Sequence, residues 1–385
     1  MPMKKTKNRL LGVLILFLLA GCLPKENRTT QDTHLQVGKI DSLFTSRYQQ
    51  DLFHGGVVIS HNGKVIYENY LGIADRSWNI PVTKDVKFDI ASLNKSMISA
   101  LVLKAVEEGK LSLNDKLFDL LKDFSYEGIF DPKITLSNML SHTSGLPDYD
   151  QIPEELRRNQ FRKFKRMRFT NEEYVNFISK IKPVNEPGKQ FYYSNFAYHL
   201  VAIILEETYH MPFSQILKEK LTRPLGLKHA VSVSKNDQII KHLAKGYNYD
   251  EKTGKWLQNP FIDLSLGRRI FSTASDLNRW AQVMDNPGYL NKHSLELMKT
   301  NHLVGISKHV SYGYGWVVVD ADNKSEMGNL GIEKPYIIHG GSTDGYRAML
   351  ININRGEYVI SFLSNVGDRT GEMELAKQIV NLLTK

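Results

Sequence analysis

Near the start of the chain, two runs of β-branched and aromatic residues joined by a tight-turn pair predict an antiparallel hairpin. Residues 57–60 and 64–70 are rich in β-branched and aromatic side chains, and the Asn62-Gly63 pair between them is typical of a type I′ turn. After Ser92, apolar residues recur at helical spacing until about Gly109. The pattern therefore predicts that strands open the domain and that Ser92 lies at the start of a helix.

The C-terminal part of the chain returns to strand-like patterns. Strands are predicted over residues 312–319, 336–339, 346–353 and 358–363, followed by an amphipathic helix over 372–383. Between the two ends, residues from about 111 to 263 alternate helical patterns with proline and glycine breaks. Together these patterns predict an α+β fold. An antiparallel sheet built from both chain ends would be flanked by helices, with a mainly helical region inserted and a cleft between them.

The first residues have the features of an export signal. Four basic residues precede an apolar run over residues 10–20, which has about half of the roughly 20 residues that a membrane-spanning helix needs. The run ends in Leu19-Ala20-Gly21-Cys22, which resembles a bacterial lipobox. We therefore expect residues 1–21 to be a lipoprotein signal peptide and Cys22 to carry the lipid. The alternative is ordinary signal cleavage beside an idle cysteine.

This interpretation implies an exported bacterial lipoprotein of the cell envelope, attached to a membrane through its lipid. Residues 22–38 are polar and are expected to form a tether, followed by a hydrolase domain over residues 39–385. Because Cys22 is the only cysteine, the chain can form no intramolecular disulfide. The net charge of +9 includes four charges of the signal peptide, and the remaining charge of about +5 does not indicate a nucleic-acid partner.

Residues 157–168 concentrate seven arginine and lysine side chains in a short span. Such a segment can contact an anionic membrane or envelope polymer, because opposite charges attract. It can equally form the solvated face of a helix. The sequence leaves its role open, together with the oligomeric state of the protein.

Ser92 and Lys95 form the first chemical motif. On a helix their side chains lie about 60° apart and can face the same cleft. A partly buried amine with a lowered pKa can take the serine proton and prepare the oxygen to attack a carbonyl, while the N–H of Ser92 can face the developing oxyanion. Ser232 and Lys235 have the same spacing, but they lie in a polar stretch that does not open an apolar helix.

Two further motifs follow Ser92-Leu93-Asn94-Lys95 along the chain, namely Tyr193-Ser194-Asn195 and His339-Gly340-Gly341. In this order they resemble the S-x-x-K, Y-x-N and H-x-G elements of beta-lactamase-related, penicillin-binding-protein-like serine hydrolases. The resemblance extends from about residue 40 to the C-terminus and includes the stretches 140–147, 224–227 and 272–277. It implies a double displacement, in which Ser92 forms an acyl-enzyme that water then hydrolyses.

The resemblance also implies a role for each motif. Tyr193 and Lys95 would share the proton transfers, and the phenol would act as a base only if the neighbouring ammonium lowered its pKa. Asn195 would hydrogen-bond Lys95 or the substrate amide, and the backbone N–H groups of Ser92 and Ser342 would form the oxyanion hole. The expected residues are catalytic Ser92, Lys95 and Tyr193, and substrate-binding or oxyanion residues Asn195, His339, Gly341 and Ser342.

The chain departs from the efficient beta-lactamases of this family at His339, where they have a lysine. An imidazole is mostly neutral at pH 7, so a fixed cation for a substrate carboxylate is lost. Arg268 or Arg269, before the stretch 272–277, is one hypothetical replacement; the alternative is that both point to solvent. His142 and His339 suggest no metal, since no similarly spaced ligand set accompanies them.

The sequence therefore predicts a serine hydrolase without metal or cofactor, acting on a small-molecule or peptide substrate. The substrate would be a D-amino-acid peptide, an ester or, weakly, a beta-lactam, and the sequence does not decide among these classes. The alternative from another class is a lipoprotein that binds penicillin or muropeptide on the same fold without turnover.

Overall fold

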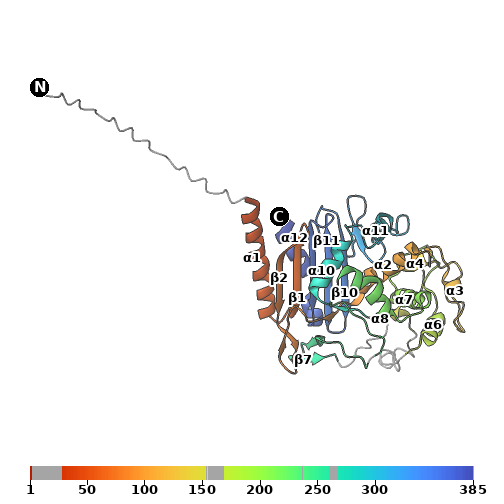
Figure 1. Ribbon diagram of the computed structural model, residues 1–385. Helices are drawn as coiled ribbons and strands as arrows, with labels where there is room; N and C mark the ends of the chain where they lie inside the picture. The colour runs from red at the N-terminus through yellow and green to blue at the C-terminus, as the bar shows by residue number, and fades with distance from the viewer. Residues whose placement is uncertain (2–27, 153, 155–168, 236, 260–267, 385) are drawn as a thin grey trace.

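A six-stranded antiparallel sheet forms the centre of the protein, in a computed structural model that describes residues 1, 28–152, 154, 169–235, 237–259 and 268–384 (Figure 1). The strand order is β2-β1-β12-β11-β10-β9, so strands from both ends of the chain lie side by side in the middle of the sheet. The bounds are β1 Gly55–His61, β2 Lys64–Leu71, β9 Val317–Val319, β10 Tyr336–Thr343, β11 Tyr346–Ile353 and β12 Tyr358–Ser364.

The sheet begins with the hairpin that the β-branched and aromatic runs on either side of Asn62-Gly63 predict. Asn62 and Gly63 both have positive φ, 47° and 78°, as a type I′ turn requires. Strand β1 then pairs with β12 over its whole length, from Gly55 opposite Ser364 to His61 opposite Tyr358. The prediction that the two chain ends share one antiparallel sheet is confirmed.

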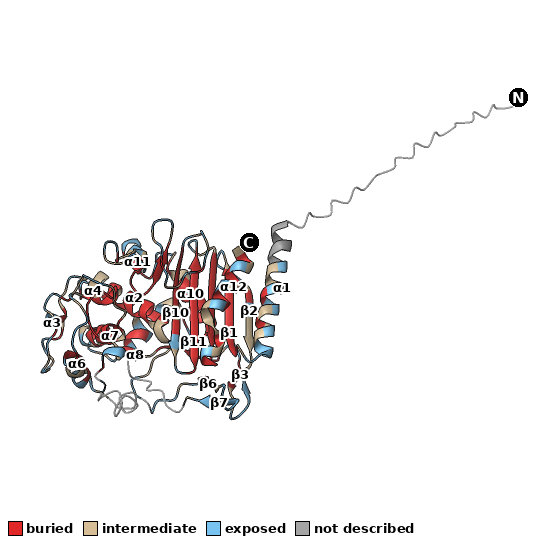
Figure 2. Ribbon diagram, turned by 180° about the vertical axis from the view of Figure 1, so that it is seen from behind, coloured by how far each residue is buried: buried red, intermediate tan, exposed pale blue. Residues whose placement is uncertain are grey.

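Helices cover both faces of the sheet (Figures 1 and 2). On one face, α1 and α12 pack against each other and over the apolar side chains of β1, β11 and β12. On the other face, α10 lies across the strands, and α2 and α7 continue the same core into the helical region. The longer helices are α1 Arg28–Gln49, α2 Asn94–Glu107, α6 Asn171–Ser179, α7 Asn195–Tyr209, α10 Ala274–Val283, α11 Lys292–Lys299 and α12 Glu372–Thr384.

Shorter elements connect these layers. The small strands are β3 Ile73–Asp75, β4 Ile80–Pro81, β5 Phe88–Asp89, β6 Tyr247–Asp250, β7 Lys255–Gln258 and β8 Phe271–Ser272. The short helices are η1 Ala91–Leu93, α3 Leu117–Leu120, α4 Leu136–Leu140, η2 Tyr149–Gln151, α8 Phe213–Ile216, η3 Leu217–Thr222, α9 Arg223–Leu225 and η4 Gly367–Thr370. Strand β5 and helix η1 lead directly into α2, and this segment carries the Ser92 motif.

Three elements differ from the predicted ones. Helix α1 begins at Arg28, so the second half of the segment predicted as a polar tether is helical and leads into the core through Ile40 and Phe44. The run 312–319 is a strand only at its end, because β9 pairs with β10 over three residues. The middle region also contains the β6–β7 hairpin, whose partly exposed polar strands give little alternating signal.

Two predicted features lie outside the described residues. The lipobox with Cys22 and the signal segment belong to residues 2–27, and the basic segment, residues 157–168, lies within residues 155–168. Over the part of the chain that the structure describes, none of the helices combines the length and apolar character needed to span a bilayer.

Candidate active site

The segment that carries Ser92 changes from strand to helix within a few residues. Strand β5 ends at Asp89, whose Oδ1 accepts a hydrogen bond from the N–H of Ala91 at 2.8 Å. Ala91 has a φ of 47°, a left-handed conformation that costs energy in a residue with a side chain. This turn places Ser92 in η1, immediately before α2, with its side chain partly exposed. The predicted position at a helix start is confirmed.

The amine of Lys95 lies beside the Ser92 hydroxyl. Its Nζ is 3.3 Å from Ser92 Oγ and donates to Asn195 Oδ1 at 2.8 Å. Lys95 is only 3% exposed, and this burial lowers the pKa of its ammonium to about 7, while the charge of Asp148 opposes the shift. At neutral pH a large fraction of Lys95 therefore has a free lone pair, as a base that accepts the serine proton requires.

Tyr193 contacts Ser92 from the other side. Its phenol shares a hydrogen bond with Ser92, and its ring stacks on His142 with centroids 4.2 Å apart. Burial raises the pKa of the phenol, an effect that the hydrogen bond with Ser92 only partly opposes. The neighbouring Lys95 therefore does not lower the Tyr193 pKa below its ordinary value. Tyr193 stays protonated at neutral pH and can donate a hydrogen bond, which leaves Lys95 as the base.

His339 is a neutral side chain fixed by two neighbours. Burial lowers its pKa to about 4, and the charge of Lys95 acts in the same direction. Nδ1 lies 2.7 Å from the carbonyl of Gly340, which can only accept, so this nitrogen carries the proton. Nε2 then accepts from the hydroxyl of Tyr312 at 2.9 Å. His339 therefore supplies no positive charge to the cleft.

Close glycine contacts bring β10 against the nucleophile segment. A Cβ on Gly341 would lie 2.4 Å from the carbonyl oxygen of Ile90, which precedes η1. A Cβ on Gly315 would lie 2.6 Å from the N of Ser96. Real Cβ atoms essentially never approach other atoms so closely, so both positions need glycine. Strand β10 also extends beyond its pairing with β9, which ends at Ile338, and continues through Gly341 and Ser342 to Thr343.

The N-terminus of α7 supplies Asn195 and reveals a residue that the sequence did not single out. Asp148 accepts hydrogen bonds from the Nδ2 of Asn195 at 2.9 Å and from its backbone N at 3.1 Å. Burial raises the pKa of the Asp148 carboxyl to about 6, against the opposing effects of Lys95 and of its hydrogen bonds. The family-like stretch 140–147 ends one position before Asp148, and this proximity is the one sequence feature that could have pointed to Asp148.

The two arginines are held in ion pairs. Arg268 pairs with Glu206 of α7 at 2.6 Å and bonds Asn171 of α6. Arg269 pairs with the buried Asp89 and also donates to Thr343 Oγ1 at 3.2 Å, at the end of β10. Each guanidinium is balanced by a carboxylate. Neither the hypothesis of a replacement cation for His339 nor the solvent-facing alternative describes these positions.

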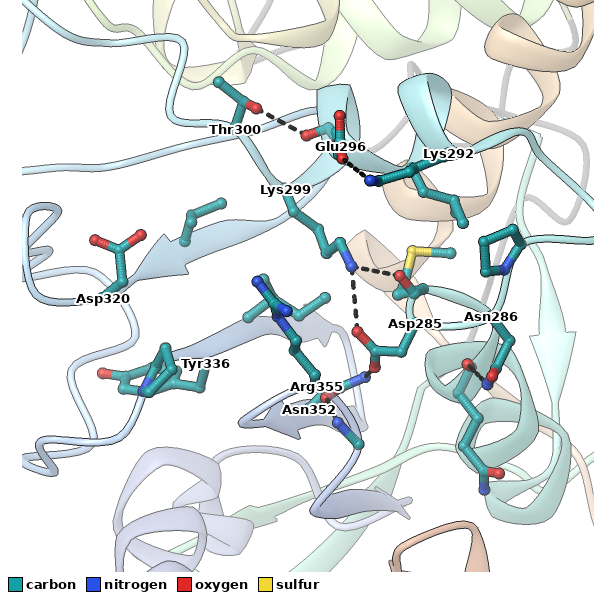
Figure 3. A pocket seen from close by; sticks show the side chains of 18 of the residues that line it. Asp285, Asn286, Lys292, Glu296, Lys299, Thr300, Asp320, Tyr336, Asn352 and Arg355 are labelled. Carbon is teal, nitrogen blue, oxygen red and sulfur yellow. Dashed lines mark hydrogen bonds and ion pairs between the residues drawn. The ribbon is translucent and has the colours of Figure 1, made fainter.

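Two other candidates lie away from the Ser92 cluster. The Ser232 hydroxyl donates to the carbonyl of Arg269 at 2.6 Å, which gives it a structural partner. A polar cavity of about 940 Å³ lies between α10, α11 and the ends of β9–β11 (Figure 3). There Lys299 binds Asp285 at 3.1 Å and Lys292 faces Glu296 at 3.8 Å, and the lining contains none of the motif residues. Groups of three or more His, Cys, Asp or Glu that could hold a metal do not occur within the described ranges.

Comparison with known proteins identifies the family of the chain. The family model named Beta-lactamase matches residues 40–385. The chain belongs to this family. It is 25% identical to penicillin-binding protein 4* of Bacillus subtilis over 346 residues, which cover 86% of this chain and 72% of that protein. This family comprises serine hydrolases that include esterases, carboxypeptidases and beta-lactamases.

One further relative and one solved structure extend the comparison. The chain is 27% identical to the D-alanyl-D-alanine-carboxypeptidase/endopeptidase AmpH of Escherichia coli, covering 82% of each chain. Among solved structures, EstCE1, described as a hydrolase with promiscuous acyltransferase activity, superposes with a TM-score of 0.73 at 19% identity. That match covers 93% of this chain and all of EstCE1. At this identity it shows the fold, which confirms the predicted mixture of helices and antiparallel sheet.

The lowered Lys95 pKa predicts a pH dependence. A base must be unprotonated, so kcat/KM for an ester substrate should rise with pH through about 7, as Lys95 loses its proton. Lys95→Arg keeps a charge that is not lost in this range and should reduce kcat by about 10³-fold without restoring a rise at higher pH. Steady-state kinetics from pH 5 to 9 measures both effects. A flat profile for the unaltered protein would exclude Lys95 as the base.

Proposed function

We propose that the chain is an enzyme that hydrolyses an ester or amide through an acyl-enzyme on Ser92. The observation that carries the proposal is the contact between Ser92 Oγ and Lys95 Nζ, at 3.3 Å, with an amine that is partly neutral at pH 7. A protein that only binds its ligand non-covalently has no need for a buried lysine that is held beside a serine in this way.

In the proposed reaction, the lone pair of Lys95 takes the Ser92 proton while Oγ bonds to the substrate carbonyl carbon. The negative charge that develops on the carbonyl oxygen faces the backbone N–H groups of Ser92 and Ser342. The bond to the leaving group then breaks, and that group departs with a proton returned from Lys95, with Tyr193 as a hydrogen-bond donor. Water adds to the acyl carbon and gives its proton to Lys95. Lys95 passes this proton to Ser92 Oγ as that oxygen leaves, which releases the acid and restores the Ser92 hydroxyl and the neutral amine.

The charge of the site favours an uncharged substrate. His339 is neutral, and the guanidinium groups of Arg268 and Arg269 are balanced by carboxylates. A carboxylate-bearing beta-lactam or peptide terminus would therefore lack a strong cationic partner there. A cavity of about 280 Å³ borders Tyr193 and His339 and is lined otherwise by apolar side chains and glycines. Its other lining residues are Val317, Met327, Gly328, Ile338, Gly340 and Met373. We infer that this cavity receives an apolar part of the substrate.

Covalent labelling tests the nucleophile. A fluorophosphonate probe should label the unaltered protein and not Ser92→Ala, because only an activated serine attacks phosphorus at a useful rate. Ser232→Ala removes the serine of the other S-x-x-K pair and is the matched control, which should label like the unaltered protein. Mass spectrometry of the labelled peptide identifies the serine. Labelling that survives in Ser92→Ala would overturn the proposal.

The apolar cavity can be tested with Met373, which lines it from the start of α12. Met373→Ala should reduce kcat/KM about tenfold for substrates with a long apolar chain and leave esters with short chains on both sides nearly unchanged, because only the long chain reaches the lost contact. Nitrophenyl esters with increasing acyl length test whether the acyl part of the substrate occupies the cavity. Acetates with increasing alcohol length test whether the alcohol part does. Met211→Ala alters a partly buried methionine elsewhere and is the control. Equal losses for short and long substrates would exclude this site.

We also propose that the enzyme is attached to the membrane of the cell envelope by a lipid on Cys22, based on the order of basic, apolar and small residues before it. Full-length protein expressed in bacteria should incorporate labelled palmitate and sediment with membranes. Cys22→Ala should do neither, while Ser92→Ala should do both. Palmitate incorporation by Cys22→Ala would exclude this attachment.

A further inference from the structure

The amide of Asn195 lies between two groups with different requirements. Its Oδ1 accepts from Lys95 Nζ at 2.8 Å, and its Nδ2 donates to Asp148 Oδ2 at 2.9 Å. An asparagine amide can rotate by half a turn and exchange these two ends. A carboxylate only accepts hydrogen bonds, so Asp148 requires the Nδ2 end to face it. The carbonyl end must then face Lys95.

The backbone supports the same arrangement. Asp148 Oδ1 also accepts from the N–H of Asn195 at 3.1 Å, at the first turn of α7, where a negative charge is favoured by the helix dipole. Ser194, the N-cap of α7, donates from Oγ to the carbonyl of Pro147 at 2.6 Å and ties the Asp148 loop to the helix. The Asp148 carboxylate is therefore fixed relative to Asn195 both by the backbone N–H of Asn195 and by the hydrogen bond between Ser194 and Pro147.

The orientation of Asn195 determines where the Lys95 lone pair points. In the neutral amine, one N–H donates to Asn195 Oδ1. The lone pair and the other hydrogen then occupy the remaining directions around Nζ. Ser92 Oγ lies along one of these directions, 3.3 Å from Nζ. If the amide were reversed, its Nδ2 would face Lys95 as a donor. The amine would then accept that hydrogen bond with the lone pair that Ser92 needs.

We propose that Asp148 is a positioning residue of the reaction, which fixes the Asn195 amide so that the lone pair of Lys95 is directed at Ser92. This inference rests on the proposed function of Ser92 and Lys95 and goes beyond the three motifs. Asp148 also acts through its charge, because a carboxylate near Lys95 favours the ammonium form.

The neighbouring groups leave this charge effect measurable. The histidines close to Lys95 have pKa values lowered by burial and by Lys95 itself, and the buried tyrosines have raised values. These groups hold one charge state from pH 5 to 8, whereas Asp148 and Lys95 change theirs. The titratable groups that face the pair are His142, His199, His339, Tyr192, Tyr193, Tyr198 and, through Tyr192, Asp150.

Kinetics of single and double variants tests the proposal. Asp148→Asn keeps an oxygen that can accept from Asn195 and removes the charge, so the acid limb of kcat/KM should move about one pH unit lower. Asp148→Ala removes the acceptor as well and should reduce kcat about 100-fold above pH 8. In Asn195→Ala, adding Asp148→Ala should cost less than about twofold more, because its target is absent.

Asp150→Asn is the matched control, since Asp150 lies in the same loop and bonds Tyr192. It should keep the pH profile of the unaltered protein. Losses that multiply in the double variant would overturn the positioning role, and an acid limb that stays in place in Asp148→Asn would overturn the charge effect. If Asp148→Ala does not fold, Asp148→Leu, alone and with Asn195→Ala, removes the acceptor in a side chain of similar size and tests the positioning role in the same way. Absence of fluorophosphonate labelling in the unaltered protein would instead reject the proposed function itself.

Discussion

The burial of the Lys95 amine is the constraint on which the arrangement of the site depends. Removing an ammonium from water is costly unless other groups stabilise it, and in this protein the cost appears as a pKa lowered to about 7. The compensation comes from the Asn195 carbonyl and from the ring faces of Tyr193 and Tyr198, 4.9 and 5.5 Å from Nζ. It is partial, which leaves the amine close to its titration point at neutral pH.

This burial requires three distant parts of the chain to meet. Helix η1 carries Ser92 and the adjoining α2 carries Lys95, the start of α7 carries Asn195, and β10 closes the third side with His339 and Gly341. The sheet built from both chain ends brings β10 next to η1, and the glycine at 341 lets the two backbones approach. The fold thus supplies the site by long-range packing, and a small change in that packing would alter the exposure of Lys95.

Local patterns were sufficient to predict much of this structure. The Asn62-Gly63 hairpin, β11 and β12 follow from their strand-like runs, and the helix after Ser92 follows from its apolar spacing. The features that the sequence did not predict depend on contacts between distant residues. Asp148 becomes significant only because α7 begins beside it, and the carboxylate partners of Arg268 and Arg269 lie 62 and 180 positions away. The spacing of residues along the chain does not indicate which distant residues pair in the fold.

The charge distribution connects this architecture to substrate choice. The histidines and tyrosines around Ser92 are neutral at pH 7, and the arginines at its edge are balanced, so a fixed anion on the bound substrate gains little from them. In the proposed reaction, negative charge appears on the carbonyl oxygen only as Ser92 attacks, and the backbone N–H groups of Ser92 and Ser342 act on it at that stage. Interactions made mainly in the transition state increase kcat, whereas those made equally in the ground state do not. Because the site has no fixed cation, its electrostatic stabilisation in the proposed reaction acts on the reacting carbonyl, which all esters and amides share. In this proposal, selection among these substrates is left to the shape of the apolar cavity beside Tyr193.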